Sequence, residues 1–288
     1  MFEFIEEHRH EFRVAKMCQI LAVSKSGYYE WRGRRMSEQK KRRAELTKEI
    51  RFTFHQSNKI YGSPKITRAL RKRGIQVSEK TVTRIMKEEG LRSRTVKKVK
   101  ATTNSAHRLP VFPNLLNQAF DVDHPKHVWV ADITYIWTQE GWLYLATVMD
   151  LYSRRILGWQ MSRRMNKELV LTALQRALIA APPIPGIVHH SDQGSQYASK
   201  AYQQLLRANG MYTSMSRKGN CYDNACIESF HGIIKRELIF HRTYFTREEA
   251  TQEIFEYIIH FYNAKRIHSA CQYQTPLEYE QAYYLNQA

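Results

Sequence analysis

Three carboxylates stand at positions where their chemistry matters. Asp132 lies inside the mostly apolar segment 129–135, where a carboxylate is costly unless it is paired, capped or bound to a metal ion. Asp192 directly follows a second apolar segment, 187–190, and Glu228 lies in a stretch with helical periodicity. Two magnesium ions held by oxygen ligands can activate the attacking oxygen and stabilise the leaving one in phosphoryl transfer. The three acids are therefore candidate catalytic residues and metal ligands.

The two aspartates can share a metal site only if their strands are neighbours. Paired strands lie roughly 5 Å apart. If segments 128–137 and 187–190 pair, Asp132 and Asp192 reach the same end of one sheet.

The Glu228 helix is expected to carry two stripes. The apolar stripe contains Ile227, Phe230, Ile234 and Leu238, and the polar stripe contains Glu228, His231, Gly232 and Lys235. Because i, i+3, i+4 and i+7 positions share a face, Glu228 and Lys235 lie on the same side, two turns apart. Glu228 can then bind metal while Lys235 contacts a phosphate. We also expect His231 to contact DNA.

The elements that must position these residues follow from hydrophobic periodicity. Strands are expected at 128–137, 142–149, 155–161, 187–190 and 211–215, and helices at 166–180, 198–208, 223–240 and 246–263. Three consecutive strands followed by alternating helix and strand predict an α/β domain with a mixed five-stranded sheet and flanking helices.

The first hundred residues hold most of the positive charge. They contain 27 Lys and Arg against 11 Asp and Glu, so they carry about +16 of the net +18. Such an asymmetry favours binding to a polyanion and indicates a nucleic-acid-binding arm ahead of a nearly neutral body. A solvated basic surface is the plainer alternative.

Two helix-turn-helix patterns occur in this all-α arm. In residues 12–35, two short helices flank a turn at Ala22, with Ser24 as cap of the second, and a basic helix opened by Ser37 follows at 37–52. The second pattern has one helix begun by Ser63 as cap and another capped by Ser78 and stopped at Gly90. The helix after Ser78 would direct four side chains at DNA, Lys80, Thr83, Arg84 and Lys87. A small helical bundle without a DNA-binding role would show the same periodicity of inward-facing apolar residues.

These patterns divide the chain into four parts. We expect a helix-turn-helix-like region at 1–52, a second helix-turn-helix DNA-binding region at 53–98, a linker at 99–122 and the catalytic domain with its C-terminal helices at 123–288. Four scattered cysteines, no charged-then-apolar leader and no apolar run of membrane-spanning length predict a cytoplasmic protein without a membrane partner.

The chain resembles the second-frame (OrfB) transposases of the insertion-sequence-three family, which carry an Asp-Asp-Glu acidic triad. The spacing of 35 residues between Asp192 and Glu228 is that of retroviral-type integrases and related bacterial transposases. The match also runs through Tyr61-Gly62, residues 129–135, Tyr144 to Asp150 with Arg154, residues 190–194, Asp223 to Phe230, and Tyr262-Asn263 with Arg266, His268, Thr275 and Pro276. One departure is Cys271-Gln272, where the family usually has Leu-Gly.

This resemblance implies a ribonuclease-H-like catalytic domain whose triad is Asp132, Asp192 and Glu228. It implies Mg²⁺ as cofactor, with Mn²⁺ as a substitute, and cleavage of element ends followed by strand transfer from a 3′-OH. The expected partners are the terminal inverted repeats and target DNA, further copies of the chain on DNA, and a first-frame (OrfA) protein. Nucleoid association is the expected location.

Several assignments have alternatives. The chain could be a DNA-binding regulator with an inert body, or a nuclease acting on hybrids. Asn263, Arg266 and His268 could contact DNA phosphate or make structural bonds. The plainer expectations are packing for His189 and His190, a turn for Asp150, and capping of the Glu228 helix for Asp223 and Asn224.

Overall fold

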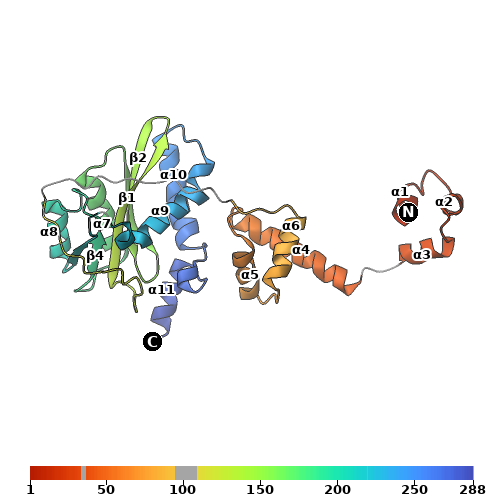
Figure 1. Cartoon of the computed structure of the whole chain (residues 1–288), viewed down its shortest axis with the longest axis horizontal. Coiled ribbons are helices and arrows are strands. Elements are labelled where there is room, and N and C mark those ends of the chain that lie inside the picture. The colour runs from red at the N-terminus through yellow and green to blue at the C-terminus, as the bar shows by residue number, and fades with distance from the viewer. Residues whose placement is uncertain (34–36, 95–108, 219, 288) are drawn as a thin grey trace. The chain divides into compact units, whose positions relative to one another are not determined.

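The computed structural model describes residues 1–33, 37–94, 109–218 and 220–287. Residues 99–108 of the expected linker, and the basic run at 97–100, lie outside the described residues. The chain divides into two units, Met1–Thr53 and Phe54–Ala288 (Figure 1). No helix in the described ranges is long and apolar enough to cross a membrane. The finer division into four domains stays a prediction.

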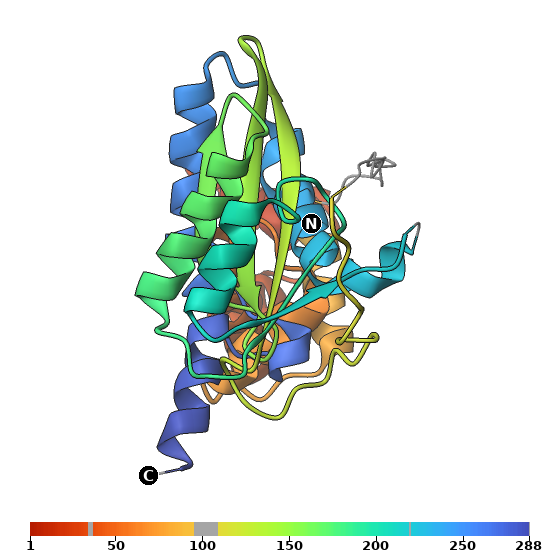
Figure 2. The same ribbon diagram turned by 90° about the vertical axis from the view of Figure 1, so that its left-hand side faces the viewer.

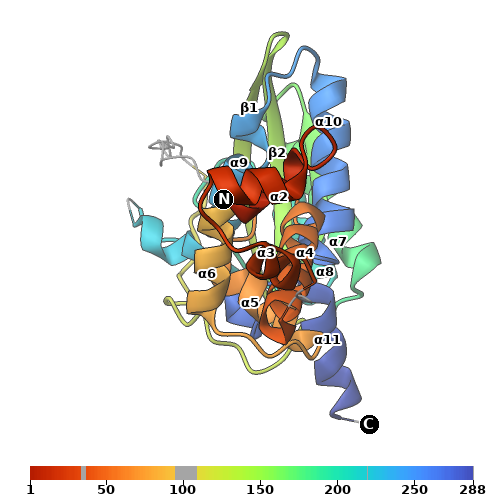
Figure 3. The ribbon, with the colours of Figure 1, turned by 90° about the vertical axis from the view of Figure 1, so that its right-hand side faces the viewer.

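The first unit contains the first helix-turn-helix pattern. Its helices are α1 (Phe2–Glu7), α2 (Val14–Ile20), α3 (Lys25–Gly33) and most of α4 (Glu38–Gln56) (Figure 3). Ala22 takes a left-handed φ of 51° in the turn, and the Ser24 hydroxyl accepts from the Gly27 N–H at 3.2 Å. A small core of Ile5, Met17, Cys18 and Tyr28 joins α1, α2 and α3. The helix α1 had no counterpart among the expected elements.

The second unit begins with the other helical pair, α5 (Ser63–Lys72) and α6 (Glu79–Glu88). The Ser78 side chain caps α6 by accepting from the Thr81 N–H, as expected. The cap position of α5 is one residue earlier than expected: Gly62 takes it, and Ser63 is the first helical residue.

Helix α5 and the residue pair before it are attached to the C-terminal segment of the same unit. The Tyr61 hydroxyl donates to the Lys265 carbonyl at 3.1 Å and accepts from the Ile267 N–H at 2.9 Å. Lys72 pairs with Glu278 at 2.7 Å. Tyr61, one of the residues that carry the family resemblance, therefore has a structural role: it attaches the start of α5 to the C-terminal segment.

A mixed five-stranded sheet forms the centre of the second unit, as expected. The strands are β1 (Val128–Thr138), β2 (Gly141–Asp150), β3 (Ile156–Ser162), β4 (Val188–Ser191) and β5 (Tyr212–Met215). They lie in the order β3-β2-β1-β4-β5 (Figure 2). Central β1 pairs antiparallel with β2 and parallel with β4.

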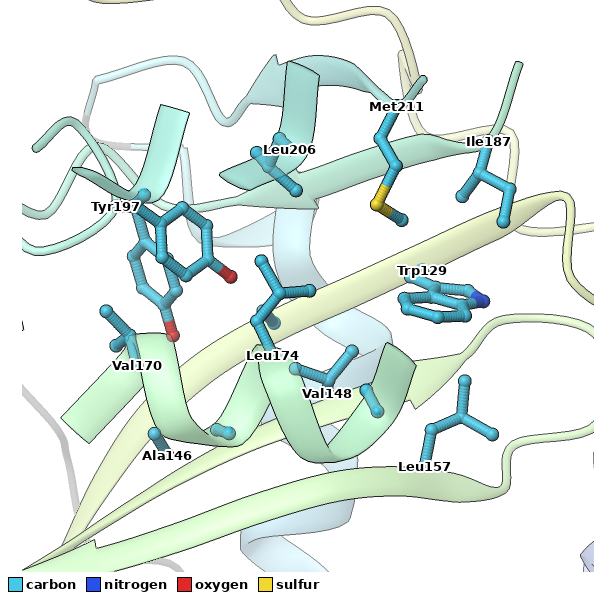
Figure 4. Packing of buried hydrophobic residues seen from close by; sticks show 14 of the residues in the cluster. Trp129, Ala146, Val148, Leu157, Val170, Leu174, Ile187, Tyr197, Leu206 and Met211 are labelled. Atoms are coloured by element: carbon cyan, nitrogen blue, oxygen red, sulfur yellow. The ribbon is translucent and has the colours of Figure 1, made fainter. Parts of the chain in front are cut away.

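The main core lies between the sheet and two helices, α7 (Lys167–Ala180) and α8 (Lys200–Ala208). Trp129, Val148 and Leu174 are fully or almost fully buried there (Figure 4). Helix α7 approaches β3 so closely that a Cβ at Gly158 would lie 2.2 Å from the Ala173 carbonyl oxygen. Only glycine fits there, because this contact is to backbone.

Helices on the other side of the sheet complete the unit. They are α9 (Ala225–Glu237), α10 (Arg247–Glu256), its π-helical continuation η3 (Tyr257–Asn263) and α11 (Pro276–Leu285). Strand alternation separates the two sides, because Ala146 and Val148 pack in the main core while Thr147 contacts His231 of α9. Gln272, where the family usually has glycine, takes a left-handed φ of 52°.

Candidate active site

Strand register brings the two candidate aspartates together. Ala131 of β1 pairs with Ser191 of β4 in parallel, so Asp132 and Asp192 are the next residues on adjacent strands. This confirms that the two strands are neighbours. Both aspartates are partly buried, and they lie where the pairing of β1 with β4 ends.

The turn after β4 fixes the carboxylate of Asp192. Its Oδ1 accepts from the Gly194 N–H at 2.9 Å. A Cβ at Gly194 would lie 2.9 Å from the same oxygen, so any larger residue there would displace the Asp192 carboxylate.

Asp132 is held from the opposite direction by α9. Oδ2 of Asp132 lies 3.2 Å from Nδ1 of His231, and Nε2 of the same ring lies 2.9 Å from the Thr147 hydroxyl. His231 is only 5% exposed. The ring therefore links β2 to the Asp132 carboxylate, and its burial leaves little surface for the DNA contact that we expected of it.

Glu228 is exposed one turn before His231 on α9. Partial desolvation raises the pKa of Glu228 although the residue is exposed, and the negative charge of Asp132 adds to this effect. Among the described residues, no group of three or more acidic, histidine or cysteine side chains is arranged so that it could hold a metal ion. Glu228 thus faces Asp132 from a helix rather than completing a preformed cluster.

Lys235 lies farther along the same stripe. Its ammonium stands 4.7 Å from the centre of the Tyr135 ring. Burial lowers the pKa of Lys235, and the charge of Asp132 partly offsets that effect. Glu228, His231 and Lys235 all therefore face the Asp132 region, as the expected stripe requires.

A buried tyrosine lies next to the two aspartates. Burial raises the pKa of Tyr197 well above its usual value, and the charges of Asp132 and Asp192 add to that effect. Within the described ranges its hydroxyl has no hydrogen-bond partner.

Asn224 and Asp223 do not cap the Glu228 helix as expected. Asn224 occupies the cap position, but its side-chain amide donates to the Ala131 carbonyl at 3.3 Å instead. Asp223 accepts from Arg217, whose guanidinium lowers the pKa of that carboxyl. Asn224 thus ties the start of α9 to the residue before Asp132.

The histidines of β4 and Asp150 have structural partners. His189 bonds the Tyr202 hydroxyl at 3.0 Å, and His190 bonds the Ser214 hydroxyl at 2.8 Å. Asp150 accepts from the Ser153 N–H and from the Lys126 N–H. The packing and turn interpretations fit these contacts.

The C-terminal motif also makes structural bonds. Arg266, 6% exposed, donates to both oxygens of Glu237 at 2.7 to 2.8 Å. The Asn263 amide brackets the Ile156 backbone by accepting from its N–H and donating to its carbonyl. His268 accepts from the Ala270 N–H. The structural alternative for Arg266 therefore fits the geometry, and a phosphate contact does not.

The basic side chains of α6 remain available to a partner. Lys80, Thr83, Arg84 and Lys87 are exposed, while Val82, Ile85 and Met86 face inward. This is the division of faces expected for a helix that enters a DNA groove, and the DNA contacts themselves stay a prediction.

Sequence reasoning missed Thr147 and Tyr197, and it gave Asn224 a capping role in place of its bond to Ala131. Thr147 and Asn224 act through partners distant in the sequence, and no local spacing marks these three residues. Only the register of β2 against β1, which pairs Thr147 with Asp132, could have indicated one of them.

Comparisons with known proteins agree with this arrangement. Models of the integrase core domain match residues 122–221 and 209–276, and a model of an HTH-like domain matches residues 41–99. The chain is 45% identical over 268 residues to the insertion element IS600 uncharacterized 31 kDa protein of Shigella sonnei, covering 93% of this chain and 98% of that one. It is 41% identical over 281 residues to the transposase InsF for insertion sequence IS3A of Escherichia coli, covering 97% and 98%.

Solved structures with a similar arrangement share little sequence. The simian T-cell lymphotropic virus intasome in complex with the PP2A regulatory subunit B56 gamma is similar at 15% identity and a TM-score of 0.47, over 81% of this chain and 73% of that one. The HTLV-2 integrase catalytic core domain in complex with magnesium gives 15% identity and a TM-score of 0.42, over 55% and 97%.

Proposed function

Because the chain belongs to the transposases of the IS3 insertion-sequence family, we propose that Asp132, Asp192 and Glu228 hold the divalent metal ions of its DNA transposition reaction. Transposition and integration of DNA are the function of the chain. The metal dependence and the triad are the parts that we infer from the site.

The parallel register of β1 and β4 carries this proposal. It sets Asp132 beside Asp192 without any further adjustment. Glu228 lies one turn before His231 on α9, and His231 contacts the Asp132 carboxylate, so Glu228 lies on the side of α9 that faces Asp132. Carboxylates gathered in this way repel one another, and a cation relieves the repulsion.

The donor set fits Mg²⁺, with Mn²⁺ as a substitute. All three candidate ligands offer carboxylate oxygens, and magnesium retains waters and substrate oxygens as its other ligands, so an open site suits it. The Tyr197 hydroxyl, which lacks a partner among the described residues, supplies a further polar group beside the two aspartates. When bound, the ions would activate the attacking oxygen and stabilise the leaving one.

The remaining residues orient this machinery. His231 and Thr147 fix Asp132, and the Gly194 N–H fixes Asp192. Because His231 acts through Asp132, it is a positioning residue. Lys235 supplies a positive charge on the same stripe, where a DNA phosphate would lie.

We infer the DNA partners from the positions of the basic face of α6 and of the candidate metal site. The exposed basic face of α6 would bind the terminal inverted repeats, and the catalytic end of the sheet would receive both element and target DNA. An element has two ends, so we infer that several copies assemble on DNA. A first-frame protein and nucleoid association remain part of the proposal.

A cleavage assay tests the proposal. The full chain is incubated with a labelled duplex that carries its element's terminal repeat, with and without Mg²⁺. Strand cleavage that requires the metal is the expected result. A regulator with an inert body would bind the duplex and leave both strands intact.

A further inference from the structure

A group of aromatic rings with two exposed tryptophans lies on the β1–β2 hairpin beyond the candidate active site. Trp137 and Trp142 are 59% and 43% exposed, and their ring centres lie 4.8 Å apart at a steep angle. The ring centres of Tyr135 and Trp142 lie 5.1 Å apart. We call these three rings the aromatic face. The sheet alternation that buries Ile136 and Thr138 leaves this face uncovered.

Lys235 of α9 links the aromatic face to the catalytic centre. Strand alternation places Tyr135, three residues beyond Asp132, on the opposite face of β1, but the Lys235 ammonium lies over the Tyr135 ring at 4.7 Å. Lys235 shares its helix with His231, which contacts the Asp132 carboxylate. A strand held at Lys235 would therefore continue past Tyr135 toward the two tryptophans.

The hairpin that carries these rings is fixed from its other side. Arg247, the first residue of α10, donates to the carbonyl oxygens of Trp142 and Glu140. The Gln139 N–H donates to the Tyr244 carbonyl at 3.0 Å. Figure 2 shows the hairpin rising past the green helices, with α10 along its flank. The rings thus stand on a preorganised support, which lowers the entropy cost of binding.

Positive charge borders the aromatic face. Ser162 at the end of β3 pairs with Tyr144, so the exposed Arg163 and Arg164 follow at the hairpin end of the sheet. The amide of Gln196, in the loop after Asp192, donates to the Met165 carbonyl at 3.2 Å, which places that loop beside the same connection. The acid of the hairpin turn, Glu140, is paired with Arg247.

We propose that the aromatic face stacks against unpaired bases of the DNA strand that enters the candidate metal site; this rests on the proposed function. Flat rings bind exposed base faces without regard to sequence, and bordering arginines attract the backbone. A paired duplex offers no free base faces, so the occupant is a strand separated near the reacting phosphate.

A second copy of the chain is the weaker candidate for this face. A stable interface buries about 800 Å² on each partner. Aromatic side chains supply about 150 to 250 Å² each when fully buried. Two partly exposed tryptophans bordered by arginines fall short of that area.

The test compares two duplexes with the same terminal repeat, one fully paired and one with three unpaired bases at the cleavage junction. The full chain, W137A/W142A and W137F/W142F are measured by fluorescence anisotropy. Tyr212→Ala removes an exposed aromatic from the far edge strand β5 and is the matched control. A 2-aminopurine among the unpaired bases reports stacking directly.

The wild-type chain should prefer the unpaired junction, and W137A/W142A should lose about tenfold or more of that preference, since stacking contributes about 1 to 3 kcal/mol per base. Its affinity for the paired duplex should stay within about twofold, and the aminopurine should become brighter. The phenylalanine variant and Tyr212→Ala should behave like wild type.

Three outcomes would overturn the proposal. Equal losses on both duplexes would show a general DNA contact, and an unchanged preference would show no contact. A change in the oligomeric state of W137A/W142A without DNA, measured by sedimentation, would identify the face as a protein interface. If the wild-type chain cleaves in any of these cases, the proposed function survives; a wild-type chain that never cleaves would refute both.

Discussion

At the scale of single residues, the position of the Asp132 carboxylate depends on contacts with His231 and Thr147 that the sequence pattern does not predict. Its place in an apolar strand, and its spacing from Asp192 and Glu228, are sufficient to select it as a candidate. His231 was expected at a DNA surface because it shares a polar stripe with Lys235. The structure buries it between Thr147 and Asp132 instead. A helical stripe shows which residues share a side, and only tertiary packing decides how deep each one lies.

His231 should affect metal use more than DNA binding. We expect His231→Ala to raise the Mg²⁺ concentration needed for half-maximal cleavage by about tenfold or more, as loss of a residue that orients a ligand does. His231→Asn should recover part of this, because its amide can still donate to Asp132. Magnesium titrations of cleavage at saturating DNA measure the effect. Equal metal requirements in all three proteins would leave His231 with a packing role alone.

Lys235→Ala should be milder than any change in the triad. The role proposed for Lys235 is a contact to a DNA phosphate that does not carry the reaction, so we expect weaker DNA binding near the cleavage site and a residual rate that remains measurable. Lys235→Arg keeps the charge and should retain most of the activity. Single-turnover cleavage rates across a range of DNA concentrations separate the two effects.

At the scale of elements, the sheet was predictable and the attachments between elements were not. The five strands follow from short apolar segments, of which residues 128–137 alternate as a half-buried strand does, while residues 143–149 form a continuous run typical of a strand that is buried on both sides. Helix α11 had no counterpart among the expected elements, although Thr275 and Glu278 form a capping box and Pro276 lies in its first turn. The apolar residues of α11 have little helical periodicity, so the hydrophobic pattern did not indicate this helix. The link from Asn224 to Ala131 spans 93 residues, which no local pattern can reveal.

The hydroxyl of Tyr61 makes two of the hydrogen bonds that attach the α5 region to the C-terminal segment. Tyr61→Phe removes it and leaves the Ile267 N–H and the Lys265 carbonyl without this partner. The expected loss is about 1 to 3 kcal/mol in the free energy of unfolding of the second unit. Tyr222→Phe, at an exposed tyrosine, is the control. Urea unfolding followed by far-ultraviolet circular dichroism measures both. If Tyr61→Phe lowers the free energy of unfolding no more than the control does, the hydrogen bonds of Tyr61 do not stabilise the second unit.

At the scale of the whole molecule, charge and chemistry are separated along the chain. The first hundred residues hold about +16 of the +18 net charge, and the three candidate ligands lie beyond residue 130. The structure qualifies this separation, because α5 and α6 belong to the same unit as the catalytic sheet. The second helix-turn-helix region is therefore expected to work as an attached part of the catalytic unit.

The basic face of α6 should set the salt dependence of DNA binding. In K80A/R84A/K87A, we expect weaker binding to the terminal repeat and a shallower slope of log affinity against log salt, by about 0.9 for each DNA phosphate that the variant no longer neutralises. Substituting Arg163 and Arg164 instead should spare the affinity for a fully paired duplex. Anisotropy at several salt concentrations gives the slopes. An unchanged slope in the triple variant would place the recognition surface elsewhere.

The most direct test measures DNA cleavage and DNA binding together in the triad variants Asp132→Asn, Asp192→Asn and Glu228→Gln. Each substitution keeps the side-chain volume and removes one metal-binding charge. With Mg²⁺ and a labelled terminal-repeat duplex, cleavage and joining should disappear in all three, while the affinity for the duplex stays close to that of the wild-type chain. Substantial Mg²⁺-dependent cleavage by any one variant would contradict the assignment of that residue, and cleavage by all three would refute the metal site.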